Sequence, residues 1–115
     1  MSAKVAISVV INTLNEERNL SFALRSVAWA DEVLVCDMHS DDATQDIARA
    51  HGARVVLHER MGFADPARAF AIGEAKHDWV LVLDADELIP APLSRTIAQL
   101  VRDDVADVFR VPRLN

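Results

Sequence analysis

The sequence predicts an α/β fold, in which a Rossmann-like, mostly parallel sheet carries helices on both faces. Short runs of apolar and β-branched residues alternate with stretches that have helix-start signals or helical spacing. This alternation is typical of right-handed βαβ units. The runs are apolar at almost every position, as expected for strands buried on both faces. With 115 residues, of which 51% are hydrophobic, the chain is expected to form one domain with an ordinary core.

Five strands and four helices are expected along the chain. The predicted strands are Val5–Ile11, Glu32–Cys36, Arg54–His58, Trp79–Leu83 and Val105–Val111. The first predicted helix follows Asn15, and the others are Ala43–His51, Asp65–Ala75 and Leu93–Arg102. Pro90 and Pro92 separate the fourth strand from the last helix.

Local signals place the helix ends. Asn15 has the character of an N-cap, because two glutamates follow it where a first turn would lie. An apolar stripe with helical spacing follows, formed by Leu20, Leu24 and Val27. Gly52 is the expected left-handed stop of the second helix. Pro66, directly after Asp65, favours the start of the third.

The fourth predicted strand ends abruptly in acidic residues. Side chains alternate between the faces of an extended strand, so Asp84 and Asp86 are predicted to point the same way and Ala85 the opposite way. Two carboxylates aimed at one point suit a hard divalent cation, Mg²⁺ or Mn²⁺. The alternative is that Asp84 caps a turn and the other acids face water, because short motifs often match by chance.

Four polar clusters lie at or just after the carboxyl ends of the predicted strands. They are Asn12–Asn15, Asp37–Ser40, Gly62–Arg68 and Asp84–Glu87. In open parallel sheets, ligands bind outside the carboxyl ends of the strands, where the strand order reverses. We therefore expect the clusters to form one site. The chain has no Gly-x-Gly-x-x-Gly and no Walker loop, so the phosphate cradles of dinucleotide enzymes and P-loop NTPases are absent.

Charge and composition limit the classes of binding partner and the cellular compartment that are expected. The net charge is −6 and no block of lysines or arginines occurs, so a nucleic acid partner is not expected. Cys36 is the single cysteine, which excludes an internal disulfide and favours a reducing compartment. No apolar run approaches the ~20 residues of a membrane span. The protein is expected to be cytoplasmic, with the inner face of the membrane as the alternative location.

Several single residues have a structural interpretation beside a functional one. Cys36 is predicted to be a core residue rather than a nucleophile. The histidines lack the spacing of a zinc site. Trp29 and Trp79 are expected to pack against the sheet. His39 is left open between the surface and a nucleotide contact, and Glu87 between a turn residue and an acid that orients the site.

The clusters resemble the motifs of family 2 glycosyltransferases. The matching segments, in the family's order and spacing, are Ile7–Glu17, Val35–Thr44, Gly62–Arg68 and Leu83–Glu87. The sequence Asp-Ala-Asp-Glu at 84–87 is most similar to the group that resembles lipopolysaccharide-core glycosyltransferases. The resemblance implies a GT-A fold and a nucleotide-diphosphate sugar, and makes residues 1–115 the donor-binding, N-terminal part of such a domain.

The resemblance implies that the first two clusters bind the nucleoside. Thr13, Asn15 and Glu16 correspond to residues that line the base and the ribose. Asp37 corresponds to an acid that accepts a hydrogen bond from a base N–H.

It also implies that the last two clusters bind the ribose and the diphosphate. Arg68 corresponds to a basic residue that meets the base or the diphosphate. Asp84 would hold the ribose, and Asp86 would ligate the Mg²⁺ or Mn²⁺ that bridges the diphosphate. A cation and a guanidinium stabilise the charge that grows on a departing nucleoside diphosphate more than they stabilise the ground state.

Four positions depart from the family pattern. Asn12 replaces the usual proline, Met38 a frequent second acid, His39 a common glycine, and Ala69 an asparagine often found after the basic residue. None of these changes removes the expected metal ligand. They reshape the wall of the nucleotide pocket and leave the base and the sugar open.

The expected function is metal-dependent, inverting transfer of a sugar, from a UDP-linked donor, to a glycan or lipid-linked acceptor. Inverting transfer needs a general base, which the resemblance places C-terminal to Asn115, and Val111–Asn115 is interpreted as an interruption. The fragment alone is expected to be inactive in transfer. One alternative is a non-catalytic nucleotide-sugar-binding or scaffold module. A receiver-like phosphoacceptor domain is a weaker one, because Asn12 and Thr13 stand where a receiver has paired acids.

Overall fold

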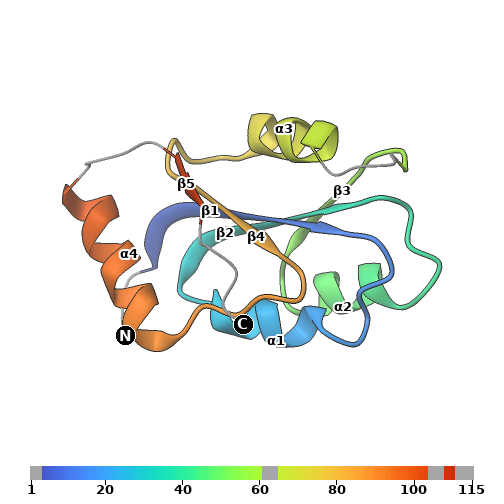
Figure 1. Ribbon diagram of the computed structural model, residues 1–115, viewed down its shortest axis with the longest axis horizontal. Coiled ribbons are helices and arrows are strands. Elements are labelled where there is room, and N and C mark those ends of the chain that lie inside the picture. Colours follow the sequence, from blue (N-terminus) through green and yellow to red (C-terminus); the bar gives the residue numbers. More distant parts are fainter. Residues whose placement is uncertain (1–3, 61–64, 104–107, 111–115) are drawn as a thin grey trace.

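The computed structural model describes residues 4–60, 65–103 and 108–110, and it has the expected α/β architecture (Figure 1). The strands are β1 (Val5–Thr13), β2 (Ala30–Asp37), β3 (Arg54–Leu57), β4 (Val80–Asp84) and β5 (Val108–Arg110). The helices are α1 (Leu20–Ser26), α2 (Thr44–Ala50), α3 (Asp65–Glu74) and α4 (Ala91–Asp103). Every element expected from the sequence is present, although the predicted last strand extends at both ends into residues outside the described part.

All five described strands are parallel, in the order β3-β2-β1-β4-β5. The chain runs outward from β1 through β2 to β3 and then returns to place β4 on the other side of β1. The strand order therefore reverses between β1 and β4, the position at which open α/β sheets bind ligands.

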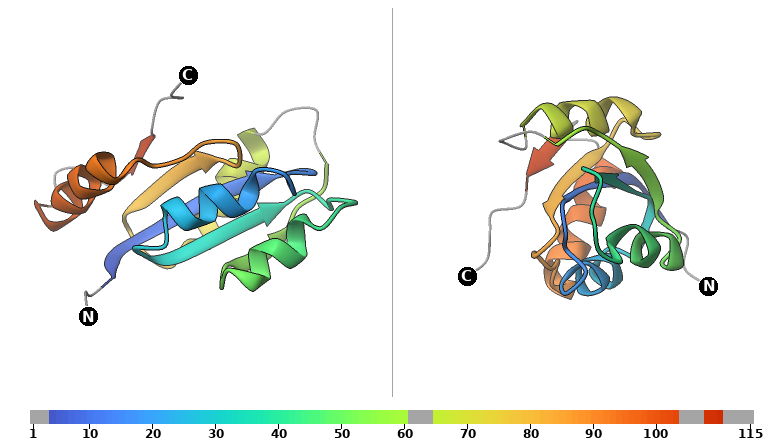
Figure 2. Two further views of the ribbon diagram at one scale, coloured as in Figure 1. Left: turned by 90° about the horizontal axis from the view of Figure 1, so that it is seen from below. Right: turned by 90° about the vertical axis from the view of Figure 1, so that its right-hand side faces the viewer.

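Two layers of helices cover the sheet (Figures 1 and 2). Helices α1, α2 and α4 lie on one face, and α3 lies on the opposite face. Alternate residues of β1 serve the two layers, since Val9 and Ile11 pack with the first and Val10 packs with the second. This explains why the strand is apolar at nearly every position.

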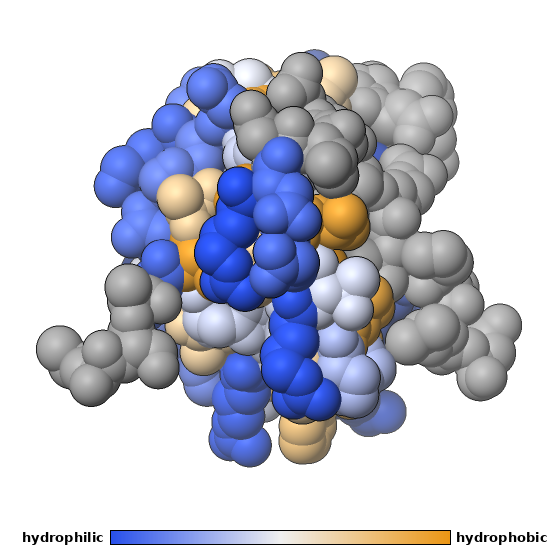
Figure 3. Space-filling view, turned by 90° about the vertical axis from the view of Figure 1, so that its left-hand side faces the viewer, coloured by the Kyte–Doolittle hydropathy of each residue, from blue (hydrophilic) through white to orange (hydrophobic). Residues whose placement is uncertain are grey.

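Helix α4 is amphipathic. Its side chains Leu93, Ile97 and Val101 pack against the larger core. The outer surface on the α4 side is mostly hydrophilic, with small apolar patches (Figure 3). No described helix is long and apolar enough to cross a membrane.

A buried hydroxyl ties the amino-terminal end of the sheet to the chain that enters β4. The Ser8 side chain donates to Glu32 at 2.7 Å and accepts from the backbone N–H of His77 at 3.0 Å. The same Glu32 oxygen accepts from the backbone N–H of Lys76 at 2.7 Å. These bonds account for a serine inside an otherwise apolar run, because each buried polar group has a partner.

The prediction that Asn15 caps α1 is wrong. Helix α1 begins at Leu20, and Asn19 stands at its N-cap position without a capping side-chain bond. Asn15 instead has a left-handed backbone, with φ 57°, in the loop after β1. Asparagine tolerates this conformation better than most residues do, so the side chain that suggested a helix start serves a turn.

Candidate functional site

A pocket of about 270 Å³ opens at the carboxyl ends of β1, β2 and β4, beside α3. It lies where the strand order reverses. The residues that line it are Asn12, Leu14, Glu16, Met38, Arg68, Asp84, Ala85 and Asp86. The lining thus combines three acidic residues and one guanidinium with three apolar residues and one amide.

The only cation among the lining residues is paired with an acid. A guanidinium nitrogen of Arg68 lies 2.8 Å from a carboxylate oxygen of Asp84. The two side chains retain 22% and 33% of their exposure, so solvent and ligands can reach the pair. The pair joins α3 to the end of β4.

The Asp-Ala-Asp-Glu segment is a turn, and Glu87 closes it. The Glu87 carboxylate accepts from the backbone N–H of Asp84 at 2.9 Å, and the Glu87 backbone N–H donates to the Asp84 carbonyl oxygen at 3.0 Å. Glu87 is therefore a turn residue whose carboxylate also fixes the backbone of Asp84.

The alternation of strand β4 continues for two residues beyond the strand itself. Strand β4 ends at Asp84, and Ala85 and Asp86 lie in the turn. Asp84 and Asp86 do line one pocket, but Ala85 lines it with them. The Ala85 side chain is nonetheless buried in the larger core with Leu81 and Leu83, so it points away from Asp84 and Asp86 as expected, although the residue borders the pocket.

Asp37 has no exposed surface and a complete set of hydrogen bonds. One carboxylate oxygen accepts from the hydroxyls of Thr13 and Ser40, both at 2.6 Å. The other accepts from the Ser40 backbone N–H at 2.7 Å and the Gln45 amide at 2.8 Å. These bonds occupy the roughly four acceptor positions of a carboxylate. Burial acts to raise the pKa of Asp37, but the hydrogen bonds from Ser40, Thr13 and Gln45 outweigh it, so the pKa lies below its usual value.

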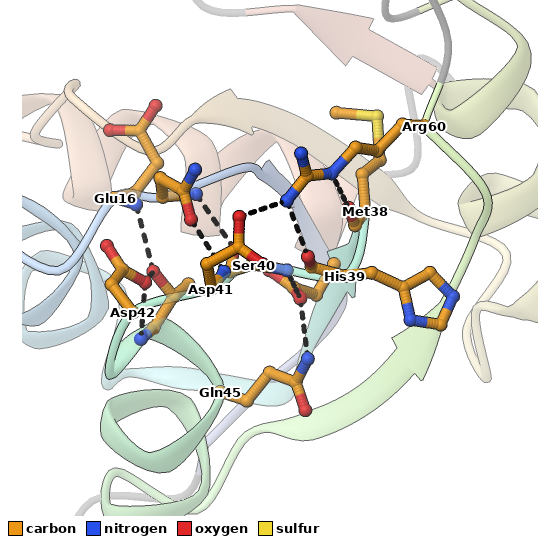
Figure 4. A network of polar contacts seen from close by, with 11 residues as sticks. Glu16, Met38, His39, Ser40, Asp41, Asp42, Gln45 and Arg60 are labelled. Carbon is orange, nitrogen blue, oxygen red and sulfur yellow. Dashed lines mark hydrogen bonds and ion pairs between the residues drawn. The ribbon is translucent and has the colours of Figure 1, made fainter.

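The loops after β1 and β2 are joined by reciprocal hydrogen bonds (Figure 4). The Asn15 backbone N–H donates to the Ser40 hydroxyl at 2.8 Å, and the Asn15 side chain accepts from the Asp41 backbone N–H at 2.7 Å. The Glu16 backbone N–H donates to the Thr44 hydroxyl at 2.9 Å. Neither loop can move far without the other.

Arg60 fixes the same loop from its outer side. Its guanidinium donates to the backbone oxygens of Met38 and His39 at 3.2 and 2.9 Å, and pairs with Asp41 at 2.6 Å (Figure 4). His39 has φ 57° and an exposed side chain that does not line the pocket. The backbone conformation accounts for the glycine that the resemblance led us to expect at position 39.

Glu16 carries the charge of the first loop into the pocket. Its backbone faces the loop network while its carboxylate points away from it (Figure 4). Burial raises the pKa of Glu16, and the negative charges of Asp86, Asp42 and Asp84 raise it further, against a hydrogen bond with Asn19 that lowers it. The pocket mouth therefore has an excess of negative charge that a cation would relieve.

The acidic residues do not form a complete protein cage for a metal. No group of three or more potential ligands from His, Cys, Asp and Glu is assembled among the described residues. This donor set fits Mg²⁺ or Mn²⁺ held by one or two carboxylates together with substrate phosphates, the usual arrangement for Mg²⁺. It does not fit a structural zinc site, which needs four protein ligands.

The structure divides the predicted site residues into two groups. Glu16, Arg68, Asp84 and Asp86 line the pocket. Thr13, Asn15 and Asp37 lie in the network that supports it, and a direct contact between them and a nucleotide stays a prediction. From the sequence, Asn12 and Met38 are expected in the wall of the nucleotide pocket as departures from the family pattern with no assigned role, and Leu14 is not singled out. Side chains alternate between the faces of a strand, so Asn12 could have been predicted to lie on the same face of β1 as Val10, toward α3. The predicted contribution of Gly62 lies outside the described residues.

Other sequence interpretations agree with the structure. Cys36 is fully buried, and burial together with the charge of Asp37 raises the pKa of its thiol to about 11, which excludes a nucleophile at neutral pH. Trp79 is buried and Trp29 packs against the core.

A larger cavity of about 540 Å³ lies between α4 and Trp29, at the amino-terminal end of β1 and away from the converging carboxylates.

Sequence comparison identifies the family. The model described as glycosyl transferase family 2 matches residues 8–113. An uncharacterized glycosyltransferase of Rickettsia typhi is 36% identical over 104 residues, which cover 90% of this chain and 32% of that protein. One of Mycobacterium bovis is 35% identical over 96 residues, 83% of this chain and 44% of that protein. The chain spans about a third of the length of the Rickettsia relatives.

Structural comparison gives matching folds. S. aureus TarS 1-349 in complex with UDP has a TM-score of 0.73 and 27% identity, over 85% of this chain and 32% of that chain. Glucosyl-3-phosphoglycerate synthase from Mycobacterium tuberculosis, in complex with Mn²⁺, UDP and glucosyl-3-phosphoglycerate, has a TM-score of 0.66 and 31% identity, over 80% of this chain and 37% of that chain. Both likenesses cover most of this chain and a minority of the other.

Replacing His39 by glycine is expected to stabilise the protein relative to replacement by alanine. Both changes remove the imidazole, but only glycine adopts φ 57° without strain. Urea unfolding should give a free energy of unfolding roughly 0.5–1 kcal/mol higher for His39→Gly than for His39→Ala. A more stable alanine variant would contradict the left-handed conformation.

Replacing Asp37 by asparagine is expected to destabilise the protein by ~1–3 kcal/mol at pH 7, because an amide NH₂ would face donors that now meet an oxygen. The lowered pKa of Asp37 means that its stabilisation is present above the unfolded pKa and lost as pH falls through the folded one. Stability should therefore depend less on pH in the acid range, below about pH 4, in Asp37→Asn than in the wild type.

Urea unfolding at pH 7 and at pH 3 measures both effects, with the exposed Asp78→Asn as the control. Unchanged stability at pH 7 combined with weaker uridine binding would instead indicate that Asp37 contacts the base directly.

Proposed function

The chain belongs to glycosyl transferase family 2, and on that premise we propose that its pocket binds the nucleoside diphosphate of a sugar donor, UDP, together with Mg²⁺ or Mn²⁺. The observation that carries the proposal is the convergence of Glu16, Arg68, Asp84 and Asp86 on one pocket where the strand order reverses. The solved relatives in complex with UDP, one of them also with Mn²⁺, support the choice of nucleotide and metal.

Each charged residue has a task in this proposal. Asp86 would hold the cation, which when bound offsets charge on the diphosphate. Arg68 would donate charge-assisted hydrogen bonds to the same group. Asp84, which now pairs with Arg68, would accept from the ribose hydroxyls. Glu87 would keep the turn that presents both aspartates.

In this proposal, Thr13, Asn15 and Asp37 act on the nucleoside indirectly, through the loops that they support. Their hydrogen bonds hold the loops after β1 and β2 against each other. In this proposal the loops carry Glu16 toward the ribose and Met38 toward the base. A direct contact of Thr13 or Asp37 with the base would require some of these hydrogen bonds to open.

The transfer itself is proposed to be inverting, with a glycan or lipid-linked acceptor of the lipopolysaccharide-core kind, at the cytoplasmic face of the membrane. The bond from the sugar to the diphosphate breaks while the acceptor oxygen attacks from the opposite side. A general base takes the acceptor proton within hydrogen-bond reach, and we propose that it lies outside the described residues. The charges in the pocket then stabilise the departing diphosphate more than the bound donor.

Replacing Asp86 by asparagine is expected to weaken binding of UDP in the presence of Mn²⁺ far more than binding of uridine without metal. Only Asp86 is assigned to the cation, so the nucleoside contacts remain. Titration calorimetry with UDP, with and without Mn²⁺, and with uridine measures the difference. Asp78→Asn is the control, because it removes an exposed acid that precedes β4, at the end of the strand opposite to the turn. Equal losses for both ligands would refute the assignment.

Replacing Arg68 by alanine is expected to weaken UDP binding by ~1.5–3 kcal/mol, because a charge-assisted contact to the diphosphate is lost. Uridine should lose less. Arg68→Lys keeps the charge but not the planar fork, so its loss should be intermediate. If uridine suffers as much as UDP, Arg68 contacts the base. If neither ligand is affected, the residue serves only the ion pair with Asp84.

A further inference from the structure

The side chain of Asn12 is an amide without partners in the wall of the pocket. Its nitrogen and its oxygen each expose less than 1 Å², and neither has a hydrogen-bond partner among the described residues. Asn12 lies in the central strand of the sheet, paired in register with Cys36 of β2 and with Asp84 of β4. It lines the same pocket as Arg68 and Asp84.

A buried amide without partners is unfavourable unless a ligand supplies the missing hydrogen bonds. Almost all buried polar side-chain atoms in proteins have a partner, and an amide that loses water without gaining one destabilises the fold. The buried side chains of Ser8 and Asp37, by contrast, have full sets of hydrogen-bond partners. The unpaired amide therefore stands out at the one place where a ligand is expected.

The amide has both a donor and an acceptor, which restricts the ligand groups that can pair with it. Phosphate oxygens accept but do not donate, so a diphosphate would leave the Asn12 oxygen unpaired. A cation would take the oxygen and leave the NH₂ group unpaired. The partner must offer a donor and an acceptor side by side, and the planar edge of a nucleobase does so, as in bidentate pairing of asparagine with adenine.

The neighbours of Asn12 favour the base over the sugar. Leu14 and Met38 are the large apolar side chains of the pocket, and they come from the β1 and β2 ends. The acidic turn and its partner Arg68 lie on the β4 side. Because β2 and β4 flank β1 on opposite sides, the pocket has an apolar, amide-bearing end toward β2 and a charged end toward β4. Glu16 belongs to the charged end, since its charge interacts with those of Asp86 and Asp84. A flat base fits the apolar end and a diphosphate fits the charged end.

We propose that the Asn12 amide pairs with the edge of the donor's nucleobase, donating its NH₂ to a base carbonyl and accepting from the adjacent base N–H. The inference rests on the proposed function, because it assigns one part of the same ligand. It adds a specificity-determining residue that a proline at this position, the residue more usual in the family, cannot supply. With uracil, the partners would be O4 and N3–H.

Asn12→Leu tests the assignment, because leucine has nearly the same shape without either polar group. Removal of an unpaired amide should leave thermal stability unchanged or raise it. Thr13→Val is the matched contrast, since it breaks the bond to Asp37 and should lower stability. Calorimetry in Mn²⁺ should show UDP binding weaker by roughly 10-fold or more in Asn12→Leu, the size expected when two hydrogen bonds are lost.

A ligand lacking the N3–H identifies the partner. In 3-methyluridine 5′-diphosphate, the methyl group blocks the bond to the Asn12 oxygen. The wild type should bind it at least 10-fold more weakly than UDP, whereas Asn12→Leu should bind both about equally. 2′-Deoxy-UDP is the control for the ribose, and its loss relative to UDP should be the same in both proteins.

The outcomes separate this inference from the proposed function. If the wild type binds UDP and Asn12→Leu binds it equally well, the assignment of Asn12 is overturned while the proposed function stands. If the 2′-deoxy effect disappears in Asn12→Leu but the 3-methyl effect remains, the amide pairs with the ribose and the base assignment is overturned. If Asn12→Leu is clearly less stable, the amide has a structural partner such as a bound water. If the wild type binds no nucleoside diphosphate, both proposals fail.

Discussion

A buried carboxylate is tolerated only when hydrogen bonds replace the water it has lost, and Asp37 meets that condition in full. Its two oxygens accept from Thr13 at the end of β1, from Ser40 in the following loop and from Gln45 of α2. One charge thus holds three segments at the carboxyl end of the sheet. The loops that form the first side of the pocket depend on it, because Ser40 also receives the backbone N–H of Asn15. Without Asp37, Thr13, Ser40 and Gln45 would lose the acceptor that they share.

The charge of the pocket depends on a different balance. Glu16, Asp84 and Asp86 place negative charge around one opening, and Arg68 offsets only part of it. Burial raises the pKa of Glu16, and the negative charges of Asp86, Asp42 and Asp84 raise it further. Under the proposed function, a cation and a ligand with groups of both signs would relieve the repulsion between these charges. The relief would then contribute to the affinity for the donor.

The fold was predictable because its signals are local and repeated. Runs such as Val5–Ile11 and the helical stripe of α1 follow from burial on two faces and from periodicity. Element ends were less certain, since Asn15 has the chemistry of both an N-cap and a left-handed turn. Local sequence could not choose between them. The choice came from Ser40 and Asp41, about 25 residues away, which supply the partners that fix Asn15 in the turn.

The sequence by itself determined the parallel sheet and the family. It also placed the acidic and basic residues at strand ends, and these residues converge because parallel strands bring their carboxyl ends to one edge of the sheet. Only the tertiary structure decided which of these side chains face a ligand and which support the loops. Asp37 and Asp84 both end a strand, yet one is sealed by four hydrogen bonds and the other lines the pocket. Asn12 likewise gained its significance only from the neighbours that fail to pair with it. Burial and hydrogen-bond partners are set by segments far apart in the chain, so no local pattern encodes them.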